Sequence, residues 1–209
     1  MSKEKSGQAR KQINIRMLAG TGMLSAIGVV LMFFDFSIPI VPAFIKMDFS
    51  ELPALLAGFA YGPLAGVAVC FIKNLIHLAQ TSTMGIGELC NFLLGVSLVL
   101  PAGWIYKKRK SRKWALIGAL IGSVSMAVLS LPINYFVTYP MYIEMFASHG
   151  GWDAILGMYQ AIFPKVGNLL ECLAVFNLPF TLAKGLVVSL LCFLIYKPLS
   201  PILHGRIRH

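Results

Sequence analysis

Residues 52–80 read LPALLAGFAYGPLAGVAVCFIKNLIHLAQ, and this apolar run decides how many helices the chain forms. A helix needs about 20 residues to cross the hydrocarbon core of a bilayer. A run of 29 residues is therefore too long for one comfortable crossing. Gly62 and Pro63 lie a third of the way along it, where glycine loosens the backbone and proline removes a helix hydrogen bond. The run predicts a short helix over 52–61, tilted or partly embedded, and a second helix after it.

The composition of the whole chain indicates that these helices lie in a membrane. Of 209 residues, 57% are hydrophobic and only 12% are charged, and the mean hydropathy is +0.76. Soluble domains carry about 25% charged residues, because their surfaces face water. We therefore expect an all-α integral membrane protein, located in the cell membrane as a multi-pass protein. The other apolar runs are 17–34, 86–106, 114–140 and 168–196.

The basic residues are concentrated in short polar segments beside the apolar runs. Most of the 18 Lys and Arg lie near the two termini and in residues 107–113 (KKRKSRK), and the net charge is +10. Loops rich in Lys and Arg are typical of the cytoplasmic side, where they also meet anionic lipid headgroups. A nucleic-acid surface would instead interleave basic and aromatic residues on one folded face. We therefore expect the lipid bilayer, and no nucleic acid, as a partner.

The membrane topology follows from placing these basic segments on one side. If the N-terminus and residues 107–113 are both cytoplasmic, an even number of crossings separates them. A break at Gly62 gives four crossings, whereas an unbroken helix over 52–80 gives three. We predict a single membrane domain over 1–209, with six transmembrane helices and both termini cytoplasmic. It comprises a basic tail over 1–15, a helix bundle over 16–197 and a second tail over 198–209.

The first apolar run, 17–34, is interpreted as a retained helix. A basic segment before an apolar run also resembles a signal peptide, but this run is about span length and no small-residue cleavage site closes it. Gly22 and Ala26 have the small-xxx-small spacing that lets another helix approach closely. The spacing leaves open whether that helix belongs to this chain or to another protein.

Two long segments are predicted on the outer side, together with acidic residues such as Asp48 and Glu51. Residues 35–50 (DFSIPIVPAFIKMDFS) are rich in proline and aromatic residues, and residues 141–166 are expected to hold a short amphipathic helix after a hinge at Gly150-Gly151. Apolar outer segments above a small bundle suit a lid over a cavity. The alternative is that they lie at the membrane interface as aromatic anchors.

Polar side chains within the apolar runs are the candidate binding residues, because they are costly at membrane depth. Asn177, Thr181 and Lys184 are spaced i, i+4 and i+7, which places an amide, a hydroxyl and an ammonium on one helix face. Hydrogen bonding between helices is the alternative role. Further candidates in the outer half are Asn134, Glu88 and Asn91.

These side chains describe a pocket with amides, one cation and many aromatic rings. Such a pocket suits a flat, neutral, hydrogen-bonding ligand better than a bare ion. The sequence has no Walker A, HExxH or GxSxG motif and no paired catalytic carboxylates. We therefore expect no metal, no resident cofactor and no enzymatic activity, and any ATP must be bound by another subunit.

In order and spacing, these features resemble the riboflavin-specific (RibU-type) S components of energy-coupling factor (ECF) vitamin transporters. The resemblance covers about residues 16–197. Its most specific stretches are PAFIKMDFSELPALLAGFAYGPLAG (42–66) and FNLPFTLAKG (176–185), supported by MGIGELCNFLLG (84–95). It implies a six-helix subunit that captures riboflavin from outside, with a membrane coupling subunit and two cytosolic ATPases as partners. The first outer loop would close over the ligand, and the whole subunit would topple to release it inside.

The resemblance also implies roles for individual residues. Flavin contacts are expected from Asn134, Asn177, Thr181 and Lys184, and the coupling subunit is expected to meet Ala19, Gly22 and Ala26. Members of the family carry Asn where this chain has Thr181, so one ring contact is expected to be altered or water-mediated.

The chemistry of the flavin ring fits these side chains. Its pyrimidine edge alternates carbonyls with an N–H, which amides and an ammonium match. Its dimethylbenzene end and flat faces suit Phe44, Met47 and tyrosines. The remaining candidate binding residues are Lys46, Asp48, Glu88 and Asn91.

Three alternatives stay open at this point. The first is the same scaffold serving another vitamin or FMN, with Lys184 at the phosphate, although no Arg cluster accompanies it. The second is a membrane-embedded enzyme, which would need a Ser/His/Asp or paired-carboxylate constellation within the spans. The third is a lone secondary carrier, which would show an inverted repeat with broken helices in both halves.

Overall fold

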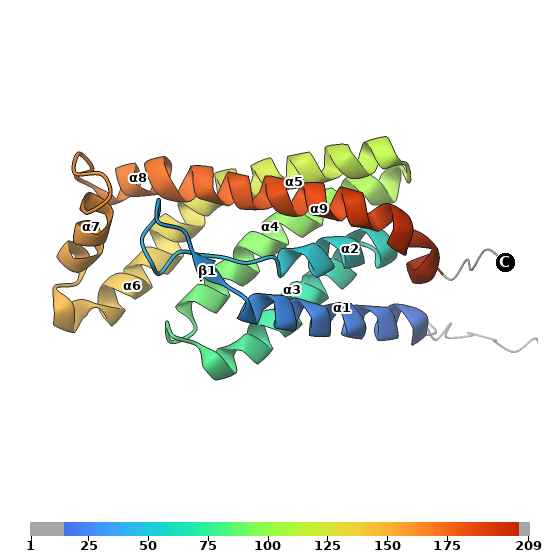
Figure 1. Cartoon of the computed structure of the whole chain (residues 1–209), viewed down its shortest axis with the longest axis horizontal. Helices are drawn as coiled ribbons and strands as arrows, with labels where there is room; N and C mark the ends of the chain where they lie inside the picture. The colour runs from blue at the N-terminus through green and yellow to red at the C-terminus, as the bar shows by residue number, and fades with distance from the viewer. Residues whose placement is uncertain (1–14, 205–209) are drawn as a thin grey trace, which may run out of the picture.

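The computed structural model describes residues 15–204, with side chains up to residue 196, so most of the two predicted tails lies outside the described residues. Most of its helices run along the long axis of a single bundle (Figure 1). The helices are α1 (Ile15–Phe33), α2 (Glu51–Tyr61), α3 (Pro63–His77), α4 (Ile86–Lys108), α5 (Arg112–Ile133), α6 (Tyr139–Met145), α7 (Trp152–Gln160), α8 (Leu169–Cys172) and α9 (Leu178–His204). Two π-helical turns, Asn134–Thr138 and Leu173–Asn177, join α5 to α6 and α8 to α9.

The apolar run 52–80 is broken at Gly62, as predicted. Gly62 has φ 106°, a conformation that costs glycine little, and it separates α2 from α3. Pro63 begins α3, where its missing N–H would have had no helical partner. Within the described residues, five helical segments are long and apolar enough to cross a bilayer. The 11-residue α2 is not among them, so the count of six crossings stays a prediction.

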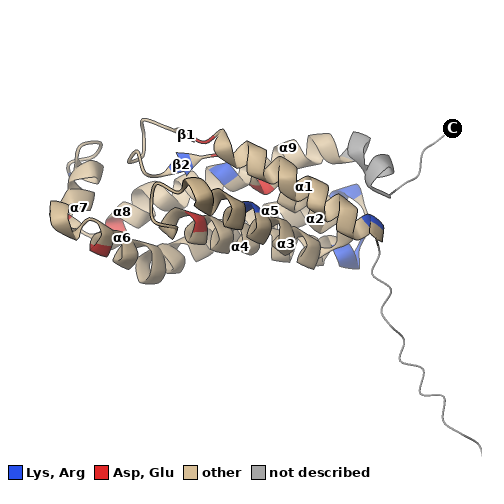
Figure 2. Cartoon of the chain, turned by 90° about the horizontal axis from the view of Figure 1, so that it is seen from below, with Lys and Arg blue, Asp and Glu red and all other residues tan. Residues whose placement is uncertain are grey.

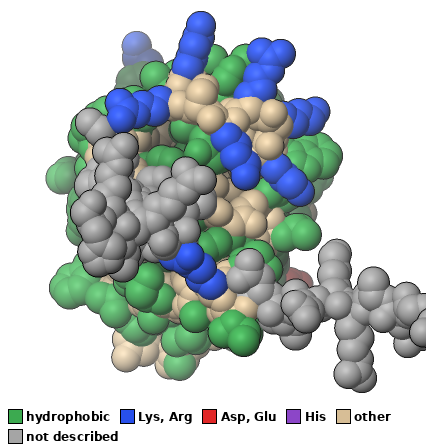
Figure 3. All heavy atoms as spheres, turned by 90° about the vertical axis from the view of Figure 1, so that its right-hand side faces the viewer, with side chains coloured by type: hydrophobic (Ala, Val, Ile, Leu, Met, Phe, Trp, Pro, Cys, Tyr) green, Lys and Arg blue, Asp and Glu red, His purple; other side chains and the backbone are tan. Residues whose placement is uncertain are grey.

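The bundle has two unlike ends. The loop end carries the segment 35–50, α6, α7 and α8, and the basic end carries the start of α1, the junction of α4 with α5 and the end of α9 (Figure 1). Acidic segments lie toward the loop end and the middle of the bundle (Figure 2). Lys and Arg side chains gather over the basic end (Figure 3).

Each end has its own hydrophobic core. Nearer the basic end, α2, α3, α4, α5 and α9 pack through small and aliphatic side chains, including Ala57, Leu98 and Ala119. Nearer the loop end, the core is aromatic and includes Tyr139, Tyr159 and Phe176, with Phe44 of the first loop packed against it. The aromatic core therefore holds both outer segments over the end of the bundle.

The two outer segments are folded. Residues 35–50 contain a short antiparallel hairpin, β1 (Phe36–Ser37) with β2 (Lys46–Met47), which was not predicted. Residues 141–166 contain α7, which confirms the predicted short helix. Gly150 and Gly151 precede it with positive φ values of 101° and 55°. At the other end of the chain, α9 continues to His204, beyond the predicted end of the bundle at residue 197.

Candidate functional site

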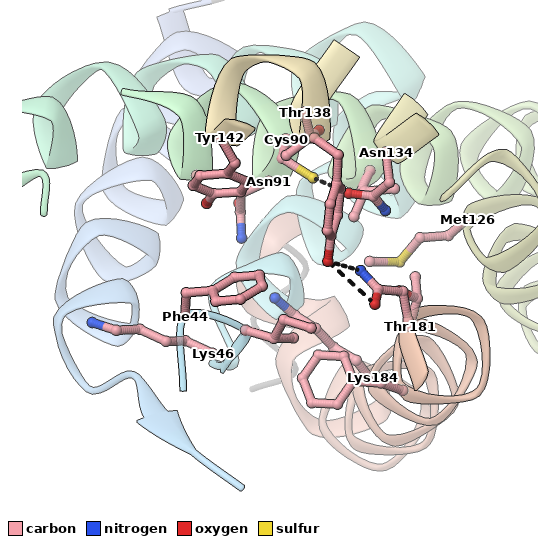
Figure 4. Close-up of a pocket in the computed structure, with 16 residues that line it drawn as sticks. Phe44, Lys46, Cys90, Asn91, Met126, Asn134, Thr138, Tyr142, Thr181 and Lys184 are labelled. Carbon is pink, nitrogen blue, oxygen red and sulfur yellow. Dashed lines mark hydrogen bonds between the residues drawn. The ribbon is translucent and has the colours of Figure 1, made fainter. Parts of the chain in front are cut away.

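A cavity of about 110 Å³ lies at the loop end of the bundle, where polar groups face aromatic rings (Figure 4). The first loop, α4, α5, both π-helical turns, α6 and α9 all contribute to its wall. Its polar lining residues include Asn91, Asn134, Asn177, Thr138, Thr181 and Lys184. Its aromatic lining residues are Phe44, Tyr139, Tyr142 and Phe180.

Two of the predicted amides stand on the π-helical turns. Asn134 begins the first turn and Asn177 ends the second. A proline, Pro140 or Pro179, lies two residues after the end of each turn. Proline has no backbone N–H, so it cannot donate a hydrogen bond to a carbonyl oxygen of the preceding turn. Inserted π-turns occur often at functional sites, because they change the direction of side chains relative to the rest of the helix.

The Asn177 amide is held by two tyrosines. The Tyr159 hydroxyl donates to Asn177 Oδ1 at 2.7 Å, and Asn177 Nδ2 donates to the Tyr139 hydroxyl at 3.0 Å. The two tyrosine hydroxyls also bond to each other. Burial raises the pKa of Tyr159 above its ordinary value, so its hydroxyl stays protonated and remains a donor. Tyr159 lies on α7, so the second outer segment fixes an amide of the cavity.

Asn134 is held within its own helix. Its Nδ2 donates to the backbone oxygen of Ser130 at 2.8 Å, and the Cys90 thiol lies 3.5 Å from its Oδ1. A thiol is a weak donor. The Asn134 carbonyl oxygen therefore keeps acceptor capacity on the side of the cavity.

A buried cluster of four charged residues adjoins the cavity. Lys184 Nζ lies 2.8 Å from Asp48 Oδ2 and 3.2 Å from Glu51 Oε2. Lys73 Nζ lies 2.8 Å from the other oxygen of Glu51. All four residues are at most 5% exposed. Charges at this depth are tolerated because each one has a partner of opposite sign.

Asp48 ties the first loop to this cluster and to α2. Its Oδ1 accepts hydrogen bonds from the backbone N–H and the hydroxyl of Ser50, the residue before α2. Burial by itself would raise the pKa of Asp48, but the ammonium groups of Lys184 and Lys73 outweigh burial and hold that pKa below its ordinary value. The carboxylate therefore stays ionised and keeps the loop attached to α9.

A second cavity, of about 560 Å³, adjoins the first. The two share Phe44, Lys46, Gly87, Asn91 and Tyr142. The wall of the second also carries Asp48 and Glu88. One oxygen of Glu88 lies 2.9 Å from His77 Nδ1, and the other accepts from the Thr81 hydroxyl at 2.9 Å.

The structure brings most of the predicted binding residues to these two cavities. Met47 is the exception, because it is buried and lines neither one. Several lining residues were not named among the predicted contacts, and Cys90, Tyr139, Tyr142 and Phe180 are among them. For Tyr139 and Tyr142, the aromatic-rich sequence of 139–146 (YPMYIEMF) was the available signal.

The small residues of α1 point in two directions. Gly20 faces inward, since a Cβ there would lie 2.1 Å from the Tyr61 hydroxyl. Ala19, Gly22 and Ala26 are exposed, and a Cβ at Gly22 would meet no atom within 4 Å. This second set is therefore not used for packing within the described chain.

Comparison with known proteins agrees with this arrangement. The family model described as "ECF transporter, substrate-specific component" matches residues 16–196. The chain is 34% identical over 194 residues to "Riboflavin transporter RibU" of Staphylococcus aureus (strain TCH60), covering 91% of this chain and 95% of that protein. It is 33% identical over 192 residues to "Riboflavin transporter FmnP" of Bacillus subtilis (strain 168), covering 90% and 94%.

Solved structures show the same fold. The S component of a bacterial ECF transporter superposes with a TM-score of 0.69 at 33% identity, covering 90% of this chain and 98% of that one. ThiT from Listeria monocytogenes superposes with a TM-score of 0.61 at 17% identity, covering 91% and 97%, and shows likeness of fold alone. The family is one of transport subunits and not of enzymes, and its members are multi-pass membrane proteins. This chain belongs to the substrate-specific components of ECF transporters.

Proposed function

We propose that this chain is the subunit that captures riboflavin for an ECF-type vitamin transporter. The observation that carries the proposal is the cavity at the loop end, where three amides and Lys184 face four aromatic rings. The amides and the ammonium match the carbonyls and N–H of the pyrimidine edge of the flavin ring, and the aromatic side chains suit its flat faces. The names of the two relatives, both riboflavin transporters, support the same substrate.

The balance of charge favours riboflavin over FMN. Asp48, Glu51, Lys73 and Lys184 sum to zero, and Lys184 already lies between the two carboxylates. A phosphate group carries a charge of about −1.5 to −2 at pH 7. It would meet a cation that is already neutralised, whereas neutral riboflavin imposes no such electrostatic cost.

The binding residues divide between the two adjoining cavities. The first cavity, at about 110 Å³, is smaller than the roughly 300 Å³ at which ligand pockets usually begin. We assign the flavin ring to it and the ribityl chain to the larger neighbour. The ring contacts are Asn134, Asn177, Thr181, Lys184, Phe44 and Asn91. The ribityl contacts are Lys46, Asp48 and Glu88, and Met47 supports the loop.

Flavin colour tests this assignment. The protein purified in detergent with riboflavin should be yellow and show a bound-flavin absorption spectrum. The double variant Asn177→Ala with Lys184→Ala should lose the colour, because the site's hydrogen-bonding groups are then missing. Lys165→Ala, which removes an exposed ammonium at the same end of the molecule, is the control and should stay yellow. Tight binding by the double variant contradicts the site, and a wild type that binds no riboflavin contradicts the function.

The exposed small face of α1 is assigned to the coupling subunit. Ala19, Gly22 and Ala26 leave room for the close approach of another membrane helix. Two cytosolic ATPases, reached through that subunit, supply the energy of ATP hydrolysis. Gly22→Leu should abolish uptake of labelled riboflavin by cells while the purified variant binds riboflavin normally. Ala183→Leu, the same kind of enlargement on an exposed face of α9, is the matched control, and equal uptake by both variants contradicts the assignment.

The basic end is assigned to the cytoplasm. With α2 counted as a short crossing, the bundle makes six crossings and the tails 1–15 and 198–209 are both inside. The concentration of Lys and Arg at this end supports the orientation. A reporter fused after Lys110 should be found inside the cell, and an external reporter contradicts the topology.

A further inference from the structure

We infer that Glu51 is a positioning residue for flavin binding, because its buried carboxylate bridges Lys184 and Lys73 and so fixes the direction of the Lys184 ammonium. The inference rests on the proposed function and adds a residue that lines neither cavity. Glu51 is the first residue of α2 and is 0% exposed. It therefore acts on the ligand only through other side chains.

The first step concerns the three N–H groups of Lys184. Asp48 Oδ2 lies 2.8 Å from Lys184 Nζ, and Glu51 Oε2 lies 3.2 Å from it. An ammonium has three donors and no acceptor. One of them donates to Asp48 Oδ2, whereas Glu51 Oε2 attracts the ammonium as an ion pair without a hydrogen bond. An N–H is therefore left for the cavity that Lys184 lines. A flavin carbonyl would accept from that remaining N–H.

The second step concerns what holds Glu51 itself. Lys73 Nζ donates to Glu51 Oε1 at 2.8 Å and to Asn91 Oδ1 at 2.8 Å, and it also donates to the Ser50 hydroxyl. All three donors of Lys73 are thus used, and its side chain is 0% exposed. Lys73 therefore fixes the Glu51 carboxylate and does not itself reach a ligand.

The third step concerns Asn91, which lines both cavities. Its side-chain oxygen Oδ1 accepts a hydrogen bond from Lys73. The side-chain N–H₂ group is therefore left for other partners, and Nδ2 lies 3.4 Å from Asp48 Oδ2. The pair formed by Glu51 and Lys73 consequently sets the direction of two cavity groups, Lys184 and Asn91.

The fourth step compares the two carboxylates that hold Lys184. Asp48 belongs to the outer segment 35–50, whereas Glu51 begins α2, whose residues Ala54, Leu55 and Ala57 are fully buried in the core. A lysine ammonium sits on a flexible four-carbon stem. It keeps one position only when its partners are themselves fixed. Of the two carboxylates, Glu51 is the one fixed by the packed core of the bundle.

A double-mutant cycle tests the inference. Riboflavin affinity is measured in detergent by quenching of flavin fluorescence for the wild type, Glu51→Gln, Lys184→Met and the double variant. We expect Glu51→Gln to weaken binding about tenfold on its own and less than twofold when Lys184 is already Met, since groups that act through one another are not additive. Equal weakening in both backgrounds overturns the inference, because it indicates a general structural effect. If the wild type itself binds no riboflavin, the proposed function fails instead.

Two further variants keep the test decisive. Glu144→Gln removes an exposed carboxylate on α6 and should leave the affinity unchanged. If Glu51→Gln cannot be purified, Glu51→Gln combined with Lys73→Met removes both charges together and avoids an unpaired buried ammonium. This double variant should weaken riboflavin binding when Lys184 is present and should weaken it less than about twofold in the Lys184→Met background. Equal weakening of binding in both backgrounds overturns the inference.

Discussion

The basic end and the loop end of this bundle use similar helices but pack them differently. At the basic end, glycines bring helix backbones into direct contact: a Cβ at Gly122 of α5 would lie 2.4 Å from the Leu98 oxygen of α4, and one at Gly118 would lie 2.9 Å from the Ala102 oxygen. At the loop end, aromatic rings, amides and four buried charges fill the space between the helices.

The difference separates stability from binding within one small chain. Lipid tails are as apolar as the side chains they replace, so helices in a membrane associate mainly through close packing and hydrogen bonds. The basic end supplies that packing. The loop end carries buried polar groups, which are costly unless each one is paired, and the pairs seen there, such as Lys184 with Asp48, also line the cavities.

The largest expected effect comes from Gly122→Ala at the basic end. The added methyl would collide with the backbone of α4, which cannot rotate out of the way as a side chain can. Overpacking of this kind typically costs about 1–3 kcal/mol. We expect a lower yield and a lower unfolding temperature, measured by thermal unfolding in detergent, while the folded fraction binds riboflavin normally.

Gly22→Ala is the control for that comparison, since its methyl would meet no atom within 4 Å. It should match the wild type in both measurements. If Gly122→Ala loses affinity while keeping its unfolding temperature, the proposed division between the two ends is wrong.

A smaller effect, of the opposite kind, is expected for Tyr159→Phe at the loop end. The change removes the hydroxyl that donates to Asn177 Oδ1 and leaves the ring in the aromatic core. Without this donor the Asn177 amide is held less firmly toward the ligand, so riboflavin affinity should fall about fivefold in titrations of the purified protein. The bond contributes about 0.5–1.5 kcal/mol to folding, so the unfolding temperature should fall by only about 2–4 °C. Tyr135→Phe, at a tyrosine that is 41% exposed, should change neither, and equal affinities for the two variants contradict the role of Tyr159.

The sequence was sufficient for features that depend on neighbouring residues. The break at Gly62 follows from local backbone chemistry. The shared face of Asn177, Thr181 and Lys184 follows from helical spacing, and the structure places all three at one cavity.

The sequence was not sufficient for features that depend on distant segments. Glu51 was interpreted only as one of the acidic residues of the outer side, but α3 and α9 each bring a lysine to it and the residue is fully buried. Tyr159 reaches Asn177 only because α7 folds back over the bundle. Neither contact has a periodic signature in the sequence, because each depends on how separate elements are placed by packing.

The smallest expected effect concerns Thr181, where this chain departs from the Asn expected for the family. Thr181 is buried at the cavity, one helical turn from Asn177 and less than one from Lys184. Thr181→Asn offers the flavin an amide in place of a hydroxyl, and we expect riboflavin affinity to rise about twofold to fivefold, within the range of one neutral hydrogen bond. Thr181→Val keeps the shape and removes the hydroxyl, so it reports whether that hydroxyl contacts the ligand. Weaker binding by Thr181→Asn with no change for Thr181→Val would mean that the size of this side chain matters and its hydroxyl does not. The hydrogen bonds to the flavin ring would then come from Asn134, Asn177 and Lys184.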